Sequence, residues 1–187
     1  MKGKVVDFNS ALISRCAKGD RKAQEEVYRL YYKAMFNTCV RILKDTAEAE
    51  DTMQEAFLSA FGKLSGFSGE VSFGAWLKRI VVNKALDVLR SRKVCFEALE
   101  EDTAESTNTD VDIQNDTDKK DMVKNIRKAI LSLPEGYRVV LSLVLLEGYD
   151  HEEIAEILNI TASTSRSQFS RARKKLVEIL QKPDNLP

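Results

Sequence analysis

Apolar residues recur three and four positions apart through most of the chain, and the strict alternation typical of a half-buried strand is absent. Helical periodicity begins near Ser10, is broken by Gly19-Asp20, and resumes in a long aromatic-rich stretch over 21–43. Further helical stretches cover 45–61, 73–93, 122–133, 135–146 and 151–158, and a last one ends before Pro183. The pattern predicts an all-α fold.

This periodicity disappears between residues 94 and 117, where the chain is acidic and rich in Thr, Ser and Asn. A segment of this composition cannot bury enough apolar surface to fold by itself. We therefore predict two small helical domains, residues 1–93 and residues 121–187, joined by an acidic flexible linker at residues 94–120.

The predicted helix at 45–61 has two distinct faces. At 100° per residue one side is apolar, and the other is polar except for Leu58. The polar side carries Glu48, Asp51, Gln54 and Glu55. An exposed leucine ringed by carboxylates favours a docking site for a positively charged helical partner. An alternative interpretation is that this face is an ordinary solvated surface. A carboxylate-bridged metal site is a third interpretation, but no second acidic helix and no histidine is placed to complete it.

A basic face is predicted on the helix at 73–93. Phe73 and Leu77 belong to its buried stripe, whereas Arg79, Asn83 and Arg90 gather on another side. The preceding Gly- and Ser-rich loop, 62–72, carries Phe67, which has no evident helical partner in the sequence. Basic and aromatic residues beside such a loop suit single-stranded nucleic acid, although the aromatic residues can equally be core.

The segment 147–175 has the layout of a helix-turn-helix. A first helix over 151–158 has Asp150 as N-cap and Glu153 three residues later, which predicts a capping box. Asn159 can take a left-handed C-cap, and Thr161 or Ser163 can begin a second helix. No acidic residue lies between Thr164 and Lys175, so this second helix suits the DNA major groove, or else is a solvated basic face.

The average charge hides this basic character. Between Glu97 and Asp121 ten acidic residues stand against Lys119 and Lys120, which makes the segment net −8. Because the formal net charge of the 187-residue chain is zero, the remainder carries net +8. A chain that is basic outside one acidic insert is compatible with nucleic-acid binding.

Other residue types exclude several classes of protein. The cysteines (Cys16, Cys39 and Cys95) are widely separated and include no C-x-x-C pair, which indicates reduced thiols. His151 is the single histidine, so a histidine-rich metal site is excluded. No apolar run approaches the roughly 20 residues of a membrane helix, and no signal-peptide core follows Met1. We expect a cytoplasmic protein with no metal and no cofactor.

Three motifs in series resemble the extracytoplasmic-function (ECF) sigma factors, two-domain bacterial transcription initiation factors. DTAEAEDTMQEAFLSAF (45–61) is similar to the family's polymerase-binding helix, and FSGEVSFGAWLKRIVVNKALDVLR (67–90) to its segment for the −10 promoter element. LPEGYRVVLSLVLLEGYDHEEIAEILNITASTSRSQFSRARKKL (133–176) is similar to its C-terminal helix-turn-helix.

The resemblance implies a non-enzymatic protein that binds core RNA polymerase and promoter DNA and promotes strand opening. It assigns polymerase binding to Asp51, Gln54, Glu55 and Leu58. It assigns contact with the melted −10 strand to Phe67, Arg79, Asn83 and Arg90, and it implies that Asn83 reads a flipped-out base. Duplex contact at the −35 element falls to Arg166, Ser167, Gln168, Ser170, Arg171, Arg173 and Lys174. The resemblance also implies an anti-sigma partner.

Two departures and two rival hypotheses accompany this resemblance. The family's recognition helix often has an apolar residue where Ser165 stands and an Arg where Gln168 stands; Gln favours adenine and Arg favours guanine. A stand-alone helix-turn-helix regulator is the main rival, but it leaves the Leu58 face without a role. A helical enzyme that uses the acidic helix would need a metal or a nucleophile that no motif supplies.

Overall fold

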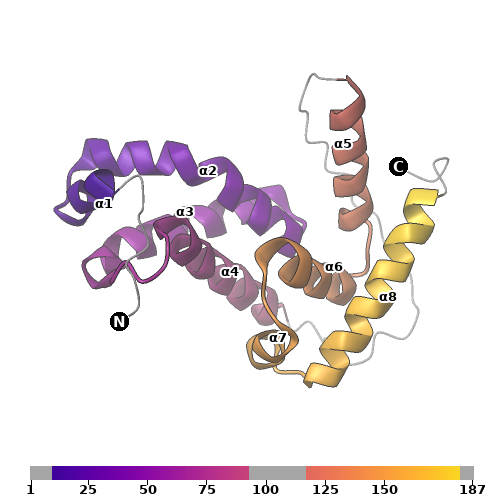
Figure 1. The fold of residues 1–187 in the computed structure, drawn as a ribbon. Coiled ribbons are helices and arrows are strands. Elements are labelled where there is room, and N and C mark those ends of the chain that lie inside the picture. Colours follow the sequence, from indigo (N-terminus) through magenta and orange to yellow (C-terminus); the bar gives the residue numbers. More distant parts are fainter. Residues whose placement is uncertain (1–9, 93–116, 182–187) are drawn as a thin grey trace. The chain divides into compact units, whose positions relative to one another are not determined.

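The computed structural model describes residues 10–92 and 117–181, and every regular element within these ranges is a helix (Figure 1). The predicted all-α class is confirmed. The chain divides into two compact units, Met1–Arg92 and Lys93–Pro187. The elements are α1 (Ser10–Ala17), α2 (Arg21–Leu43), α3 (Thr46–Lys63), the 3-10 turn η1 (Leu64–Gly66), α4 (Phe73–Ser91), α5 (Thr117–Leu131), α6 (Glu135–Ser142), the π-helical turn η2 (Leu143–Glu147), α7 (His151–Leu158) and α8 (Ala162–Gln181).

Three helices of the N-terminal unit pack on one another: α2, α3 and α4 (Figure 1). Each begins at a capping side chain. Asp20 accepts hydrogen bonds from the amides of Lys22 and Ala23, Asp45 accepts one from the amide of Glu48, and Ser72 caps α4. Since Asp and Ser satisfy the first unpaired amides of a helix, these caps set where each helix starts.

The interior between these helices is aliphatic with an aromatic edge. The rings of Tyr28 and Phe57 lie 4.8 Å apart, which joins α2 to α3. Met53, Phe57 and Leu77 are buried, as the helical period predicts. The rest of the buried apolar set on these helices comprises Ala23, Val27, Met35, Cys39, Val40, Ile42, Leu43, Ala49, Ala56, Ala60, Phe73, Val81, Val82, Ala85, Leu86 and Leu89.

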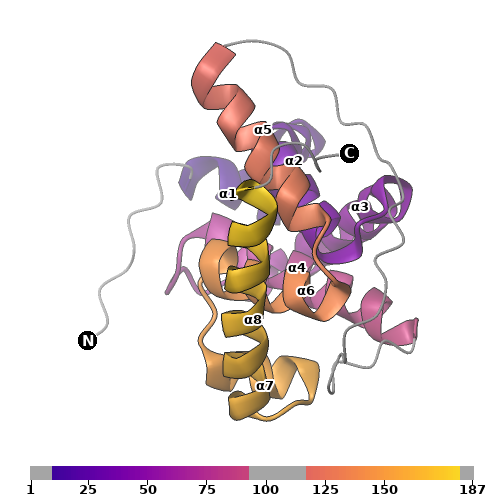
Figure 2. The same ribbon diagram turned by 90° about the vertical axis from the view of Figure 1, so that its right-hand side faces the viewer.

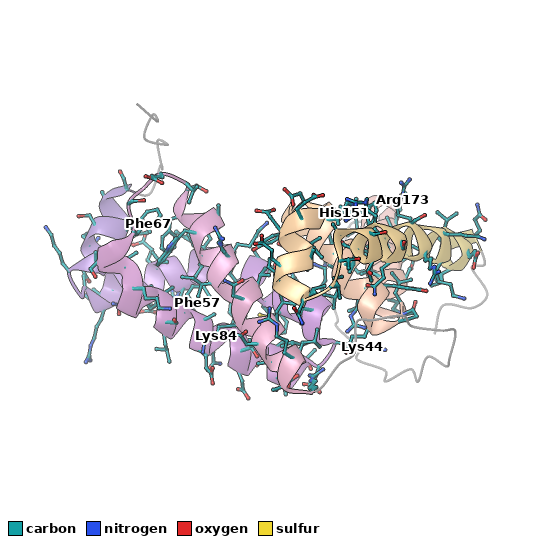
Figure 3. The ribbon with its side chains drawn as sticks, turned by 90° about the horizontal axis from the view of Figure 1, so that it is seen from below. Lys44, Phe57, Phe67, Lys84, His151 and Arg173 are labelled. Carbon is teal, nitrogen blue, oxygen red and sulfur yellow. The ribbon has the colours of Figure 1, made fainter. Side chains whose placement is uncertain are left out.

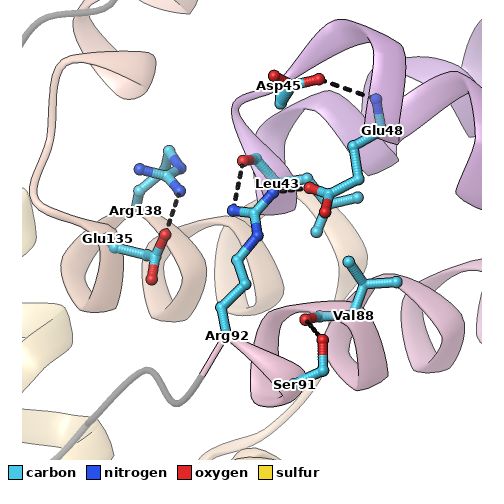
Figure 4. A network of polar contacts seen from close by, with 8 residues as sticks. All are labelled: Leu43, Asp45, Glu48, Val88, Ser91, Arg92, Glu135 and Arg138. Carbon is cyan, nitrogen blue, oxygen red and sulfur yellow. Dashed lines mark hydrogen bonds and ion pairs between the residues drawn. The ribbon is translucent and has the colours of Figure 1, made fainter.

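Arg92 connects the ends of these three helices (Figure 4). It follows α4, its Nη1 donates to the Leu43 carbonyl at the end of α2 at 3.2 Å, and its guanidinium pairs with Glu48 in the first turn of α3. One side chain thus serves a helix C-terminus, where an unpaired carbonyl needs a donor, and a carboxylate.

In the C-terminal unit, α5, α6 and α8 share a small core. Its buried residues are Ile130, Leu133, Leu141 and Ala172, with Ile126, Tyr137, Leu176 and Ile179 packed around them. Arg138 of α6 is buried as well, at 2% exposure. Its guanidinium lies 3.5 Å from the Glu135 carboxylate (Figure 4). It also donates to the Leu133 carbonyl at 3.4 Å, so the buried charge is neutralised locally.

The predicted helix-turn-helix is present as α7 and α8 (Figure 2). Asp150 and Glu153 form the expected capping box, with backbone contacts of 2.7 and 2.9 Å. Asn159 ends α7 in the left-handed conformation, and Thr161 Oγ1 accepts from the amide of Thr164 at 3.0 Å. The turn is therefore bounded by the backbone conformation of Asn159 on one side and by the side-chain cap of Thr161 on the other.

The predicted linker lies mostly outside the described residues. Its last part does not, because α5 begins at Thr117 and includes residues 117–120, which the sequence pattern assigns to the linker. Among the described residues, no helix is long and apolar enough to cross a membrane.

Replacing Asp150 with Ala should destabilise the C-terminal unit by about 1 kcal/mol, because the amide of Glu153 loses its acceptor. Hydrogen exchange at the first-turn amides of α7 measures this change directly. Asp150→Ser is the matched control, since Ser retains a capping oxygen and should lose much less stability. Equal losses in both variants would contradict a capping role.

Candidate interfaces of the two units

The polar face of α3 is oriented as predicted. Asp51, Gln54, Glu55 and Leu58 are all exposed, and Leu58 is 73% exposed. Their positions follow from the burial of Met53, Ala56 and Phe57 on the other side. A large apolar side chain in the middle of a carboxylate-bearing face has the composition of an anchor with a polar rim.

One carboxylate of this face already has an intramolecular cation. A side-chain oxygen of Glu55 lies 3.3 Å from Nζ of Lys84 on α4; the side chain of Glu55 is exposed and that of Lys84 is partly exposed. Exposed ion pairs contribute little to stability, so an incoming cation can replace Lys84 at small cost. The face is therefore available to a basic partner although Glu55 is paired.

The basic side of α4 also has the predicted orientation. Arg79, Asn83 and Arg90 are exposed, at positions that helical geometry brings to one side. Arg90 pairs with Asp87 at 2.7 Å on the exposed surface. The amide of Asn83, which has both donor and acceptor atoms, stands between the two cationic positions in the sequence.

Phe67 is packed, contrary to the expectation that it lacks a helical partner. Its ring lies 5.2 Å from Trp76 and 5.9 Å from Phe73, both on α4 (Figure 3). Tyr31 of α2 closes this cluster at 5.4 Å from Phe73. The half-buried Phe67 thus attaches the loop between η1 and α4 to the helical core.

Gly74 lets Tyr31 approach this cluster. A Cβ at position 74 would lie 3.0 Å from Cε1 of Tyr31, tighter than ordinary van der Waals contact. Neither Tyr31 nor Gly74 was predicted to support the loop, because residues so far apart in sequence are brought together only by helix packing.

On α8, the predicted DNA-contacting residues divide into an exposed group and one buried residue. The exposed group is Arg166, Ser167, Ser170, Arg171, Arg173 and Lys174. Gln168, predicted to face a base edge, is only 4% exposed. It shares the buried stripe of Ser165 and Ala172, three and four residues away, so the expected exposure of Gln168 is wrong for the free protein.

Two residues in the first turn of α7 contact α8, and the sequence pattern did not indicate either of them. Glu152 accepts from Nη1 of Arg166 at 3.1 Å. Nδ1 of His151 and the buried Oγ of Ser165 share a hydrogen bond at 2.8 Å, and the His151 ring meets that of Phe169 edge-on at 5.6 Å. Arg173 lies over Phe169, 5.8 Å from the ring centroid (Figure 3).

Three groups in or next to α1 and α2 have shifted pKa values. The hydrogen bond from Arg15 holds the pKa of Asp20 below its usual value, and burial raises the pKa of the Cys16 thiol and of Tyr28. These three groups belong to none of the predicted interfaces. Within residues 10–92 and 117–181, no group of His, Cys, Asp or Glu side chains is arranged to hold a metal ion.

Two protein families match this chain, in the order in which the units occur. The family described as Sigma-70 region 2 matches residues 27–94, and Sigma-70, region 4 matches residues 124–176. The first match contains α3 and α4, and the second contains α6, α7 and most of α8. The matched segments therefore hold the exposed faces described above.

Full-length relatives agree with these matches. The chain is 30% identical to the RNA polymerase sigma-H factor of Pseudomonas aeruginosa over 178 residues, which cover 91% of this chain and 92% of that protein. It is 31% identical to the ECF RNA polymerase sigma-E factor of Escherichia coli strain K12 over 176 residues, covering 90% and 92%.

Solved structures support the fold. CnrH in complex with the cytosolic domain of CnrY has a TM-score of 0.53 at 22% identity, covering 94% of this chain and 98% of that chain. The sigma factor RpoE in complex with the anti-sigma factor NepR from Bartonella quintana has a TM-score of 0.52 at 23% identity, covering 84% and 96%.

Replacing Phe67 with Ala should loosen the loop before α4, because the contacts with Phe73 and Trp76 are lost. Trp76 is the only tryptophan of the chain, so its fluorescence reports the change without labelling. We expect a red-shifted emission and stronger quenching by acrylamide. Ser68→Ala is the control on the same loop, and an unchanged spectrum of Phe67→Ala would show that Phe67 does not cover Trp76.

Proposed function

The chain belongs to the extracytoplasmic-function family of RNA polymerase sigma factors, and from this premise we propose how its exposed faces divide promoter recognition between them. As a sigma factor it is a transcription initiation factor and not an enzyme, and it acts with core RNA polymerase on promoter DNA. Because both regions match in order, a stand-alone helix-turn-helix regulator does not account for the chain. Residues 1–93 are proposed to bind polymerase and the −10 element, and residues 121–187 the −35 element.

Core polymerase docks on the polar face of α3. The observation that carries this assignment is the 73% exposure of Leu58 among Asp51, Gln54 and Glu55. A leucine left in water gives up the stabilisation that burial would supply, and docking recovers it. The carboxylates around it select a basic helical surface and can exchange Lys84 for a cation of the partner.

The melted −10 strand lies along α4 and the loop before it. Arg79 and Arg90 supply charge for the backbone, and Asn83 offers paired hydrogen-bonding groups to an unstacked base. Phe67 supports this loop through Phe73 and Trp76, so its contribution is to hold the loop in place as well as to present an apolar edge.

The −35 duplex is bound by the exposed side of α8. Arg166, Arg171, Arg173 and Lys174 reach phosphates or base edges, and Ser167 and Ser170 are small enough to let the helix approach. Gln168 is buried in the free protein, so the family position it occupies supports α8 from within instead of reading a base.

Two further assignments follow from the family. RNA polymerase and its promoters are cytoplasmic, so we place this chain in the cytoplasm. In one solved structure of similar fold the sigma factor RpoE is bound to the anti-sigma factor NepR, and we propose that an anti-sigma protein also binds this chain.

Replacing Leu58 with Glu should weaken binding to core polymerase about thirtyfold or more, because a charge would have to be desolvated at the centre of the interface. The affinity can be measured by titrating labelled chain with purified bacterial core polymerase.

Leu30→Glu is the matched control. Leu30 is another exposed leucine of the N-terminal unit, 56% exposed on α2, and lies outside the proposed face. It should bind polymerase like the unmodified chain. Retained binding by Leu58→Glu, or equal loss in the two variants, would remove this face from the interface.

Replacing Glu152 with Gln should tighten duplex binding by a factor of about two to five, because Arg166 is released from an exposed ion pair and one negative charge leaves the DNA-facing side. Glu156→Gln controls for the change of net charge, since Glu156 lies one turn further along the same face of α7. Weaker binding by Glu152→Gln would indicate that Arg166 needs Glu152 to hold it in position.

A further inference from the structure

A chain of contacts leads from the start of α7 to the basic surface of α8. It begins at His151, passes through Phe169 and ends at Arg173, with the rings 5.6 Å apart and the guanidinium carbon 5.8 Å from the Phe169 centroid. Ser165, Phe169 and Arg173 are four residues apart in turn, so they form one row along α8. Along this row Ser165 is buried, Phe169 is half-buried and Arg173 is exposed.

His151 is held firmly at the inner end of this row. It is the first residue of α7, directly after the Asp150 cap, so the capping box fixes its backbone. Its Nδ1 shares a hydrogen bond with the Oγ of Ser165, which is fully buried. With one ring nitrogen committed to Ser165, the plane of the imidazole is set, and its contact with Phe169 is set as well.

The ring of Phe169 in turn orders the side chain of Arg173, which lies over it on the exposed side of α8. A guanidinium over an aromatic face is attracted by the ring and stacks on it, which restricts the many rotamers of a free arginine. An arginine restricted before binding loses less freedom when it reaches a phosphate. The row thus links the packing of α7 on α8 to the conformational order of the Arg173 side chain before DNA binds.

We propose that His151 is a positioning residue for DNA binding, which orders Phe169 and through it presents Arg173 to the phosphate backbone. This inference rests on the proposed function, since it takes Arg173 to contact DNA. It assigns to His151 a role separate from direct contact with the duplex.

A pair of double-mutant cycles tests the proposal. The full chain is titrated into a labelled DNA duplex of mixed sequence at low salt, where phosphate contacts dominate the affinity. One cycle combines His151→Ala with Arg173→Ala, and the control cycle combines His151→Ala with Lys174→Ala. Lys174 is the neighbouring exposed cation on α8.

His151→Ala alone should weaken binding about two- to fivefold, the range of an exposed cation–π contact. In the presence of Arg173→Ala it should cause no further loss, because the side chain it positions is gone. In the presence of Lys174→Ala its full effect should remain, since the two act independently.

Two further variants separate the ring of His151 from its hydrogen bond. His151→Phe combined with Ser165→Ala keeps a ring beside Phe169 and leaves no hydroxyl unpaired, so it should bind close to the unmodified chain. His151→Asn can still bond to Ser165 but has no ring, so it should show the loss of His151→Ala. These variants also decide the matter if His151→Ala impairs folding, which hydrogen exchange at α7 and α8 reveals.

The possible failures are distinguishable. No effect of Arg173→Ala would show that Arg173 does not contact DNA, which contradicts its assignment in the proposed function and this inference together. A loss with His151→Ala that multiplies equally with both partners would mean that His151 seats α8 as a whole or contacts DNA directly. That result, or no loss at all, overturns the inference and leaves the −35 assignment intact.

Discussion

Burial of one stripe on α3 is the constraint on which the N-terminal unit depends. This stripe consists of Ala49, Thr52, Met53, Ala56, Phe57 and Ala60. Burying a side chain such as Met53 or Phe57 stabilises the unit by about 1.5–3 kcal/mol, far more than an exposed ion pair does. Because the helical period then leaves no freedom, Leu58 and the carboxylates beside it must face outward.

The buried stripe of α8 in the helix-turn-helix is stabilised differently from that of α3. On the inner stripe of α8, Ser165, Gln168 and Ala172 are small or polar, so burial of aliphatic groups contributes less there. Hydrogen bonding takes over part of the role, as the contact of Ser165 with His151 illustrates. A polar junction needs its partners in defined directions, which ties the orientation of α8 to the first turn of α7.

The sequence predicts correctly those structural features that depend on neighbouring residues of the same helix or turn. The capping box at Asp150 and Glu153, the left-handed end at Asn159 and the outward face of Leu58 depend on neighbours within one or two turns, and all are found. The predicted exposure of Gln168 is wrong because Gln168 lies four residues before Ala172, and this helical spacing puts both residues on the buried stripe of α8.

Contacts between different helices or loops could not be predicted from the sequence pattern. Phe67 looks unpartnered in the sequence, and its partners on α4 become visible only once α4 is packed. The hydrogen bond of His151 to a residue 14 positions away has no periodic signature at all. Such contacts depend on the angle and register between helices, which many different side-chain patterns can produce.

This chain directs RNA polymerase to promoters, as the sigma factors of its family do. The most direct test is transcription by purified bacterial core polymerase on a library of randomised promoter duplexes, with and without the chain, followed by sequencing of the transcribed templates. We expect the chain to enable initiation on a subset of templates that share two sequence elements at a fixed spacing, one for each unit. Transcription no greater than that of core polymerase alone, or enrichment of a single element without the other, would contradict it.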